Sequence, residues 1–219
     1  PPQYTYRDLH QLFTQALSDK NWPTAENVLS EMRRLNLTTA ENLQFLHVQW
    51  LAEQQKWQDI WDDPDFAMLA RLRMPRDVRS AMLTAFHHVN LLALERAGKW
   101  ETAVVLFQEM QKPLGTLLVG RLGVAQAPVL RVFGYQALLN NDAITLESLL
   151  GETTDSETIH CLNQLKSRLA PASNKTSILT QDPLQQAVLA LKANDYDTVI
   201  EVIKAIDDIT ARVLLAIEI

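Results

Sequence analysis

The sequence predicts an all-α protein built as an α-solenoid, a stack of antiparallel helix hairpins. Apolar residues recur at spacings of three and four along almost the whole chain, for example in the stripe Leu9, Leu12, Phe13, Ala16 and Leu17. This is the period of an amphipathic helix, and no segment shows the sustained alternation of a strand. Short polar turns followed by a large residue recur at intervals typical of stacked helical hairpins.

Capping signals indicate where helices start. Thr38 with Glu41, and Thr154 with Glu157, have the spacing of a capping box, in which a hydroxyl and a carboxylate bind free amides of the first turn. The pair Asp182-Pro183 has the pattern of an N-cap followed by proline at the first helical position. These signals predict helices that begin near residues 39, 155 and 183.

One type of joint between two helices recurs along the chain. Each copy has a short polar turn, an aromatic residue, two polar residues and an apolar residue. Copies lie at residues 19–25, 55–60, 96–103 and 193–199, and a weaker copy lies at 140–146. A large residue at the start of a second helix can wedge against the first helix and the neighbouring unit. The pattern predicts structural repeat positions at Trp22, Ala25, Met32, Trp57, Trp100, Ala103, Phe107, Met110 and Tyr196. The alternative is an unrelated helical bundle with ordinary core aromatics.

The spacing of the joints predicts the domain organisation. We expect a helical-repeat array over residues 1–169, a polar linker or loop over 170–183, and a further hairpin over 184–219 that includes the start of an incomplete one. The segment 208–219 is apolar on more than one face, whereas the terminal helix of a solenoid normally has a polar outer face. We therefore expect that the natural protein continues beyond Ile219 or that this face packs on another chain.

Composition limits the function classes. The net charge is −6 and the sequence pI is about 5.4, whereas nucleic-acid-binding domains usually carry a basic face. No apolar run is long enough to span a bilayer, so we expect no membrane partner. A single cysteine, Cys161, fits a reducing compartment. We expect an intracellular protein, either cytoplasmic or mitochondrial.

The sequence contains no motif for catalysis or metal binding. The five histidines and the cysteine have none of the spacings of zinc sites. His160 and Cys161 are adjacent, and adjacent residues on a helix point in different directions, so they would make a poor catalytic dyad. We therefore expect no enzyme activity, no metal and no cofactor.

Four arginines, Arg71, Arg73, Arg76 and Arg79, form a cluster of basic residues. Guanidinium groups match phosphate and carboxylate geometry, so this cluster is a candidate site for RNA or for an acidic partner. The alternative is a solvated connection in which the arginines pair with the acidic residues at 62–65.

The segment 112–132 is apolar and nearly free of charge. It predicts either a buried helix pair or an exposed docking face.

The joint at residues 90–110 resembles the pentatricopeptide repeat family, a relative of the tetratricopeptide repeats. The Ala97-Gly98 turn, Ala103, Phe107 and Met110 are similar to that family's second helix, and the first copy keeps Ala25, Leu29 and Met32 at the same offsets. The resemblance implies that single-stranded RNA runs along the first helices, with base-reading positions near Gln11 and Val89. Valine departs from the small polar residues usual at that position.

From these observations we expect a non-catalytic helical-repeat scaffold that binds a protein partner within a larger complex. Its groove would hold a peptide, a helix or a neighbouring subunit. The alternative, implied by the resemblance, is a pentatricopeptide-type single-stranded RNA-binding factor in organellar RNA processing. The charge of the inner face separates the two: lysines and arginines would favour RNA, and a neutral or acidic, aromatic-lined groove would favour protein.

Overall fold

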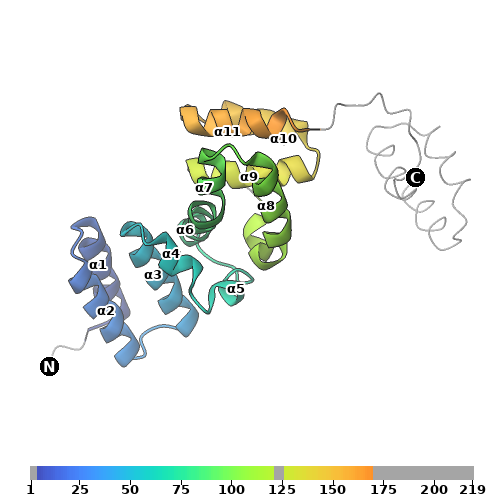
Figure 1. Ribbon diagram of the computed structural model, residues 1–219. Helices are drawn as coiled ribbons and strands as arrows, with labels where there is room; N and C mark the ends of the chain where they lie inside the picture. The colour runs from blue at the N-terminus through green and yellow to red at the C-terminus, as the bar shows by residue number, and fades with distance from the viewer. Residues whose placement is uncertain (1–3, 121–125, 170–219) are drawn as a thin grey trace, which may run out of the picture. The chain divides into compact units, whose positions relative to one another are not determined.

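The computed structural model describes residues 4–120 and 126–169, all within a unit that spans Pro1–Leu169. Helices account for 76% of these residues and the described part contains no strand, so the predicted all-α class is confirmed (Figure 1). No helix in this part combines the length and apolar character needed to cross a membrane. The expectations for Asp182-Pro183, Tyr196 and the segments 170–183 and 184–219 lie outside the described residues.

Short turns connect most of the helices in chain order. The elements are α1 (Tyr6–Ser18), α2 (Trp22–Arg34), α3 (Ala40–Glu53), α4 (Trp57–Trp61), α5 (Phe66–Leu69), α6 (Arg76–Phe86), the π-helical turn η1 (His87–Leu91), α7 (Leu92–Arg96), α8 (Trp100–Leu114), the 3-10 turn η2 (Gly115–Leu118), α9 (Ala127–Leu139), α10 (Ala143–Gly151) and α11 (Ser156–Lys166). Because α6, η1 and α7 follow one another without a break, they form one helix interrupted by a π turn.

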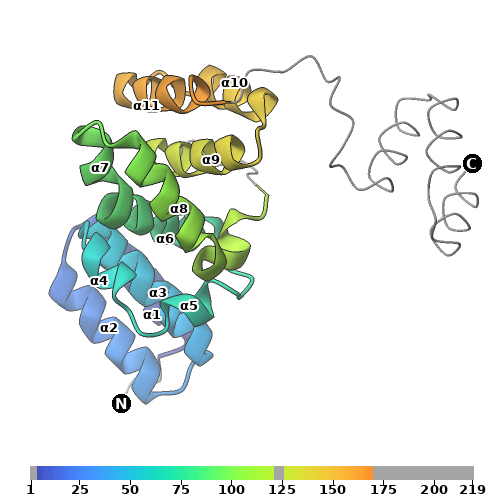
Figure 2. The same ribbon diagram turned by 45° about the vertical axis from the view of Figure 1, so that its right-hand side comes forward.

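Neighbouring helices pack in pairs. Helix α1 packs on α2, α3 on α4, α7 on α8, and α9 on α10. Helices of successive pairs also pack on one another. Helix α3 packs on α6, α6 packs on α9, and α9 packs on α11. Figures 1 and 2 show this succession from the N-terminal end of the described part to α11.

The four joints within the described residues share one backbone conformation. The middle residue of each turn has a positive φ of 50° to 70°, and these residues are Lys20 (55°), Gln55 (58°), Gly98 (67°) and Asn141 (52°). The amide that follows donates to the carbonyl five residues back, as from Asn21 to Ala16 at 2.8 Å and from Asp142 to Ala137 at 2.8 Å. This bond closes the Schellman motif at a helix C-terminus. The second helices then begin at Trp22, Trp57, Trp100 and Ala143.

Two of the predicted helix starts are displaced by one residue. Thr39, not Thr38, is the N-cap of α3, and its hydroxyl accepts the amide of Asn42 at 3.3 Å. Asp155, not Thr154, caps α11, and its carboxylate accepts both the amide and the hydroxyl of Thr158, at 2.8 and 2.6 Å. A carboxylate that accepts two hydrogen bonds from one residue outcompetes the neighbouring threonine for the cap position.

The core is centred on α6 and α9, which are buried around most of their circumference. Burial on several faces explains why α9 is apolar on several faces. Helix α9 approaches α11 closely at Gly134, where a Cβ would lie 2.5 Å from Leu162 Cδ2. Leu114, Leu117 and Leu118 of the apolar segment 112–132 are also buried, whereas Val119 is 70% exposed.

The predicted repeat positions lie at the contacts between helices. Ala25, Met32, Ala103 and Phe107 are fully buried and Trp100 is nearly so, while Trp22, Trp57 and Met110 are partly buried. Each tryptophan contacts a later helix. The indole of Trp50 on α3 donates to the Trp22 carbonyl at 3.2 Å. The rings of Trp57 and His88 lie 5.4 Å apart, and those of Trp100 and His160 lie 6.0 Å apart.

Candidate functional site

A groove with a volume of about 700 Å³ runs across the first helices of the pairs, and we call it the inner groove. Its lining comes from α1, α3, α4, the α6–η1 helix and the start of α9. The residues are His10, Phe13, Thr14, Leu17, Gln49, Ala52, Glu53, Gln55, Trp57, Asp77, Ala81, Thr84, His88, Gln126 and Pro128. Its size lies within the range of sites that hold a ligand or the side chains of a peptide.

The described lining of the inner groove contains no lysine or arginine. Its charged groups are the carboxylates of Glu53 and Asp77, and aromatic rings and amide side chains supply most of the rest. Burial is the main cause that lowers the pKa of His88, so this imidazole is neutral at pH 7. The hydroxyl of Thr84 is buried without a hydrogen-bond partner among the described residues. The groove therefore offers apolar contact and hydrogen bonds, with a negative rather than a positive charge.

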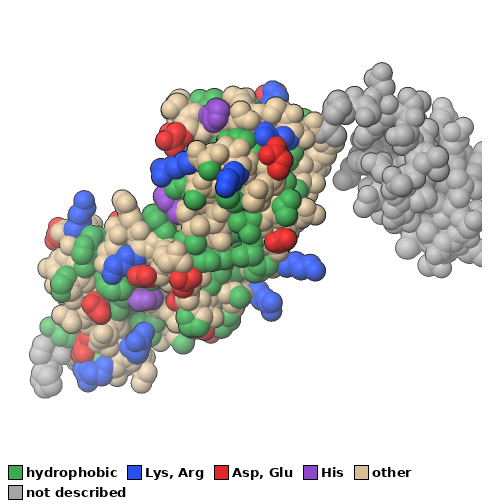
Figure 3. Space-filling model, in the orientation of Figure 1, with side chains coloured by type: hydrophobic (Ala, Val, Ile, Leu, Met, Phe, Trp, Pro, Cys, Tyr) green, Lys and Arg blue, Asp and Glu red, His purple; other side chains and the backbone are tan. Residues whose placement is uncertain are grey.

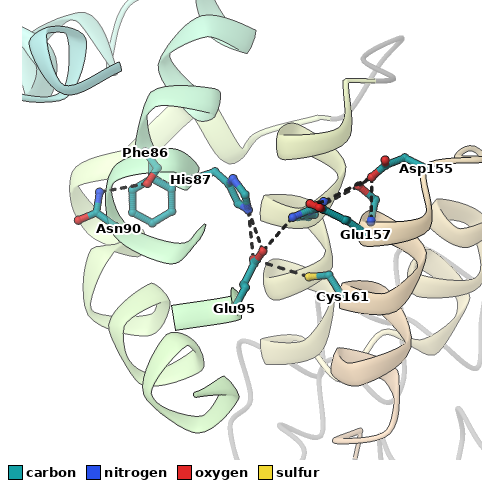
Figure 4. A network of polar contacts seen from close by, with 9 residues as sticks. Phe86, His87, Asn90, Glu95, Asp155, Glu157 and Cys161 are labelled. Carbon is teal, nitrogen blue, oxygen red and sulfur yellow. Dashed lines mark hydrogen bonds and ion pairs between the residues drawn. The ribbon is translucent and has the colours of Figure 1, made fainter. Parts of the chain in front are cut away.

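A polar cluster that is separate from the inner groove is buried between α7, α9 and α11 (Figure 4). Arg131 on α9 is at its centre. Its Nη1 donates to Glu95 on α7 at 3.1 Å, and its Nε donates to the hydroxyl of Thr158 on α11 at 3.0 Å. Its Nη2 reaches Asp155 at 3.4 Å and Glu157 at 3.3 Å. One guanidinium thus links three helices.

Glu95 receives a second set of contacts in this cluster. Both carboxylate oxygens lie 3.1 Å from Nε2 of His87, and the Cys161 thiol donates to one of them at 3.7 Å. Burial raises the pKa of Glu95, but the His87 hydrogen bond and the charges of His87 and Arg131 outweigh it and hold the pKa below its ordinary value. Burial and the Glu95 charge raise the pKa of the Cys161 thiol, so this thiol is protonated and unreactive at neutral pH.

The π turn places His87 and Glu95 on the same side of their helix. The two residues are eight positions apart, which in a regular α-helix would turn them roughly 80° away from each other at 100° per residue. One residue is absorbed by η1, where the amide of Leu92 donates to the carbonyl of His87. The two side chains are then oriented as if they were seven positions apart, which places them within roughly 20° of each other around the helix axis. The side chain of Asn90 donates to the Phe86 carbonyl at 3.1 Å, which provides a partner for a backbone group beside the bulge.

The structure separates the four arginines of the predicted cluster. Arg71, Arg73 and Arg76 are exposed, whereas Arg79 is half-buried and donates to the carbonyls of Leu117, at 2.8 Å, and Gly120. The alternative pairing with residues 62–65 does not occur within the described part. There, Asp65 accepts from Gln44 at 2.9 Å, and Asp63 accepts the Asp65 amide at 2.8 Å.

The base-reading positions implied by the resemblance lie in unequal surroundings. Gln11 is exposed on α1, and its neighbour His10 lines the inner groove, while Gln11 does not. Val89 lies half-buried within η1. His160 is exposed and Cys161 is buried, so these two adjacent side chains point in different directions.

Sequence reasoning missed the cluster of His87, Glu95, Arg131 and Cys161. These residues are spread over 75 positions, from 87 to 161, and follow no motif. One signal was present, because Arg131 is a lone charge in an otherwise apolar run, where a buried partner is expected. Within the described residues, no group of three or more His, Cys, Asp or Glu side chains is placed to hold a metal ion.

A family model described as DpdD-like matches residues 5–218 of the chain. Both the inner groove and the buried cluster lie inside the matched region. Comparison with curated proteins and with solved structures finds no match.

Proposed function

The chain belongs to the DpdD-like family, and from the geometry of its inner groove we propose that it is a non-catalytic α-solenoid scaffold that binds a protein partner. The partner would place an extended or helical segment across the first helices. Groups of the groove that favour such a segment are the ring of Trp57 and the amides of Gln49 and Gln126.

The proposal of a solenoid rests on the repeated joints. Four turns with the same positive φ and the same returning hydrogen bond connect successive helices. Small residues, Ala25 and Ala103, occupy the same offset from these turns and are fully buried. We propose degenerate repeats of the tetratricopeptide and pentatricopeptide type, since the second helix α4 has only five residues and is followed by the short α5.

The charge of the inner groove carries the proposal of a protein partner. A surface that binds single-stranded RNA combines basic side chains along the backbone path with aromatic platforms for the bases. The inner groove has the ring of Trp57, but its charged residues are Glu53 and Asp77, and the chain carries a net charge of −6. A phosphate backbone would meet repulsion there. The RNA-binding alternative is therefore the less favoured of the two proposals.

The proposal that the chain is non-catalytic rests on the buried cluster. Its titratable groups bind each other: the carboxylate of Glu95 is shared by His87, Arg131 and Cys161. The His87, Glu95 and Arg131 side chains are each at most 8% exposed. Because these groups already bind one another and are shielded from solvent, they support a structural role, which is to hold α7, α9 and α11 together.

A pull-down with a matched pair of variants tests this function. The full chain is used as bait in lysate with and without nuclease. Ala52→Lys places a long cation in the inner groove, and Ala93→Lys places the same cation on an exposed position outside it. We expect a retained protein that survives nuclease, persists with Ala93→Lys and is lost with Ala52→Lys. Retention that depends on RNA, or equal retention by both variants, would overturn the proposal.

A further inference from the structure

We propose that a second, smaller groove beside the connection between α5 and α6 binds an acidic segment of a protein that also carries apolar side chains. This arginine groove has a volume of about 360 Å³. Its lining residues are Arg71, Leu72, Arg73, Met74, Arg79, Thr116, Leu117 and Val119. It shares no lining residue with the inner groove, so the inference is independent of the proposed function.

Hydrogen bonds between the two walls fix the shape of the arginine groove. One wall is the chain that leads into α6, and the other is η2 with Val119 and Gly120. The Thr116 hydroxyl donates to the carbonyl of Ala70, and Arg79 donates to the carbonyls of Leu117 and Gly120. The Arg79 guanidinium also lies over the ring of Phe133, 5.9 Å from its centre. A groove held in this way needs little ordering when a ligand binds.

Two arginines at the arginine groove have no acidic partner within the described part. Arg71 and Arg73 are exposed and form no ion pair there, although Asp63 and Asp65 are close in sequence. Both aspartates accept other hydrogen bonds. In a chain with a net charge of −6, two guanidiniums that line one groove without an acidic partner among the described residues are a local excess of positive charge. Planar guanidinium groups bind carboxylates through two parallel hydrogen bonds.

The rest of the lining indicates a protein rather than RNA. Leu72, Met74 and Val119 give the groove an apolar wall, and the Val119 side chain is largely exposed. The described lining includes no aromatic ring, so bases would find no stacking platform. Figure 3 shows Lys and Arg side chains beside hydrophobic surface at the edge where α5 and the end of α8 lie. A bound segment in which carboxylates alternate with leucine-like side chains would match both the arginines and the apolar wall of the groove.

The test is an NMR titration of the full ¹⁵N-labelled chain with two synthetic peptides. One octapeptide alternates leucine and glutamate, and the other has lysine in place of glutamate. We expect the glutamate peptide alone to shift the amide signals of Leu72, Thr116 and Val119 at physiological salt. Equal shifts with the lysine peptide, or no shifts up to millimolar peptide, would overturn the proposal.

Charge-reversal variants locate the binding. Arg71→Glu with Arg73→Glu should weaken binding of the glutamate peptide at least tenfold. Arg7→Glu with Arg33→Glu makes the same change in net charge at exposed positions elsewhere and should leave binding within twofold. Equal loss in both variants would show that net charge alone attracts the peptide. An oligouridine that shifts the same signals more strongly would assign the groove to RNA and reject an acidic protein segment.

Ala52→Lys separates this inference from the proposed function. That substitution changes the inner groove and leaves every lining residue of the arginine groove in place. We expect the glutamate peptide to bind the Ala52→Lys variant as it binds the unchanged chain. Failure of the inner-groove proposal would then leave the titration unaffected, and failure of the titration would leave the pull-down unaffected.

Discussion

At the scale of single residues, Arg131 is the side chain that joins the buried polar cluster across three helices. It contacts Glu95 on α7 and Thr158, Asp155 and Glu157 at the start of α11. Removing one member of a buried ion pair leaves the other charge desolvated and unpaired, which costs more than the pair contributes when intact. The packing of α11 on α9 therefore depends on the charged groups at the centre of this network.

Arg131→Met tests this dependence. We expect the free energy of unfolding to fall by about 3–5 kcal/mol, because Glu95 would stay buried with one cationic partner fewer. The double variant Arg131→Met with Glu95→Leu removes both charges and should recover a large part of that loss. Urea denaturation followed by circular dichroism measures both values. A single variant that unfolds within 1 kcal/mol of the unchanged chain would contradict the role given to Arg131.

Glu95 predicts a dependence of stability on pH. Its pKa in the folded chain lies below the ordinary value of 4.5, so folding favours the ionised form. Its contribution is fully present above the unfolded pKa and is lost as the pH falls through the folded pKa. We expect Glu95→Gln to be less stable than the unchanged chain at pH 7, with the difference shrinking below about pH 4.5. Urea midpoints at pH 7 and pH 3 measure it, and a difference that grows on acidification would contradict the assignment.

At the scale of helices, the π turn η1 sets the register between α6 and α7. It absorbs one residue, and this brings His87 and Glu95 to the same face. Since π turns of this kind are single-residue insertions into an α-helix, removing the extra residue should restore a regular helix while keeping the two side chains aligned.

Deletion of Asn90 is the direct test of this register. We expect the shortened chain to fold with a stability within about 1 kcal/mol of the unchanged chain, because the remaining seven-residue spacing keeps His87 beside Glu95. Insertion of an alanine after Asn90 should instead cost about 3 kcal/mol or more, since it turns Glu95 away from its partners. Thermal melts of the two variants should therefore differ in this order. The reverse order would show that η1 does not set the register.

The joints provide a second prediction for the helical elements. Lys20 and Gly98 occupy the same left-handed position of two turns, and a side chain there is strained where glycine is not. Lys20→Gly should stabilise the chain by about 0.5–1 kcal/mol, and Gly98→Ala should destabilise it by about 1 kcal/mol. Among the described residues, no group lies within 4 Å of a Cβ built at Gly98, so no steric clash adds to the backbone strain. Shifts of the same sign in both variants would mean that the joints are not equivalent.

The sequence predicted some of these elements and could not predict others. The helical period and the repeated joints were visible because they depend on neighbours in the chain, as at Trp22 and Trp100. The N-caps were predicted one residue too early, since Thr38 and Thr39 are chemically equivalent candidates and only backbone geometry separates them. The π turn left no pattern, because it differs from an α-helix by one hydrogen-bond register. The inner groove joins residues from position 10 to position 128, which no local pattern relates.

At the scale of the whole described unit, the two grooves differ in charge. The inner groove has the carboxylates of Glu53 and Asp77, and the arginine groove has two guanidiniums without an acidic partner among the described residues. Electrostatic complementarity contributes to specificity more than to affinity. The proposals therefore assign different segments to the two grooves: a neutral or basic protein segment to the inner groove and an acidic one to the arginine groove.

Site-specific photo-crosslinking in cells tests whether the inner groove binds a protein segment. A photo-reactive amino acid at Thr14 or Gln49 would lie in the inner groove, and at Asn27 or Gln108 it would lie on exposed positions of α2 and α8. We expect one discrete adduct from Thr14 and Gln49 that resists nuclease and is degraded by protease, and none from Asn27 and Gln108. Adducts that nuclease removes, or that form equally from all four positions, would contradict the proposal that the inner groove binds a protein segment.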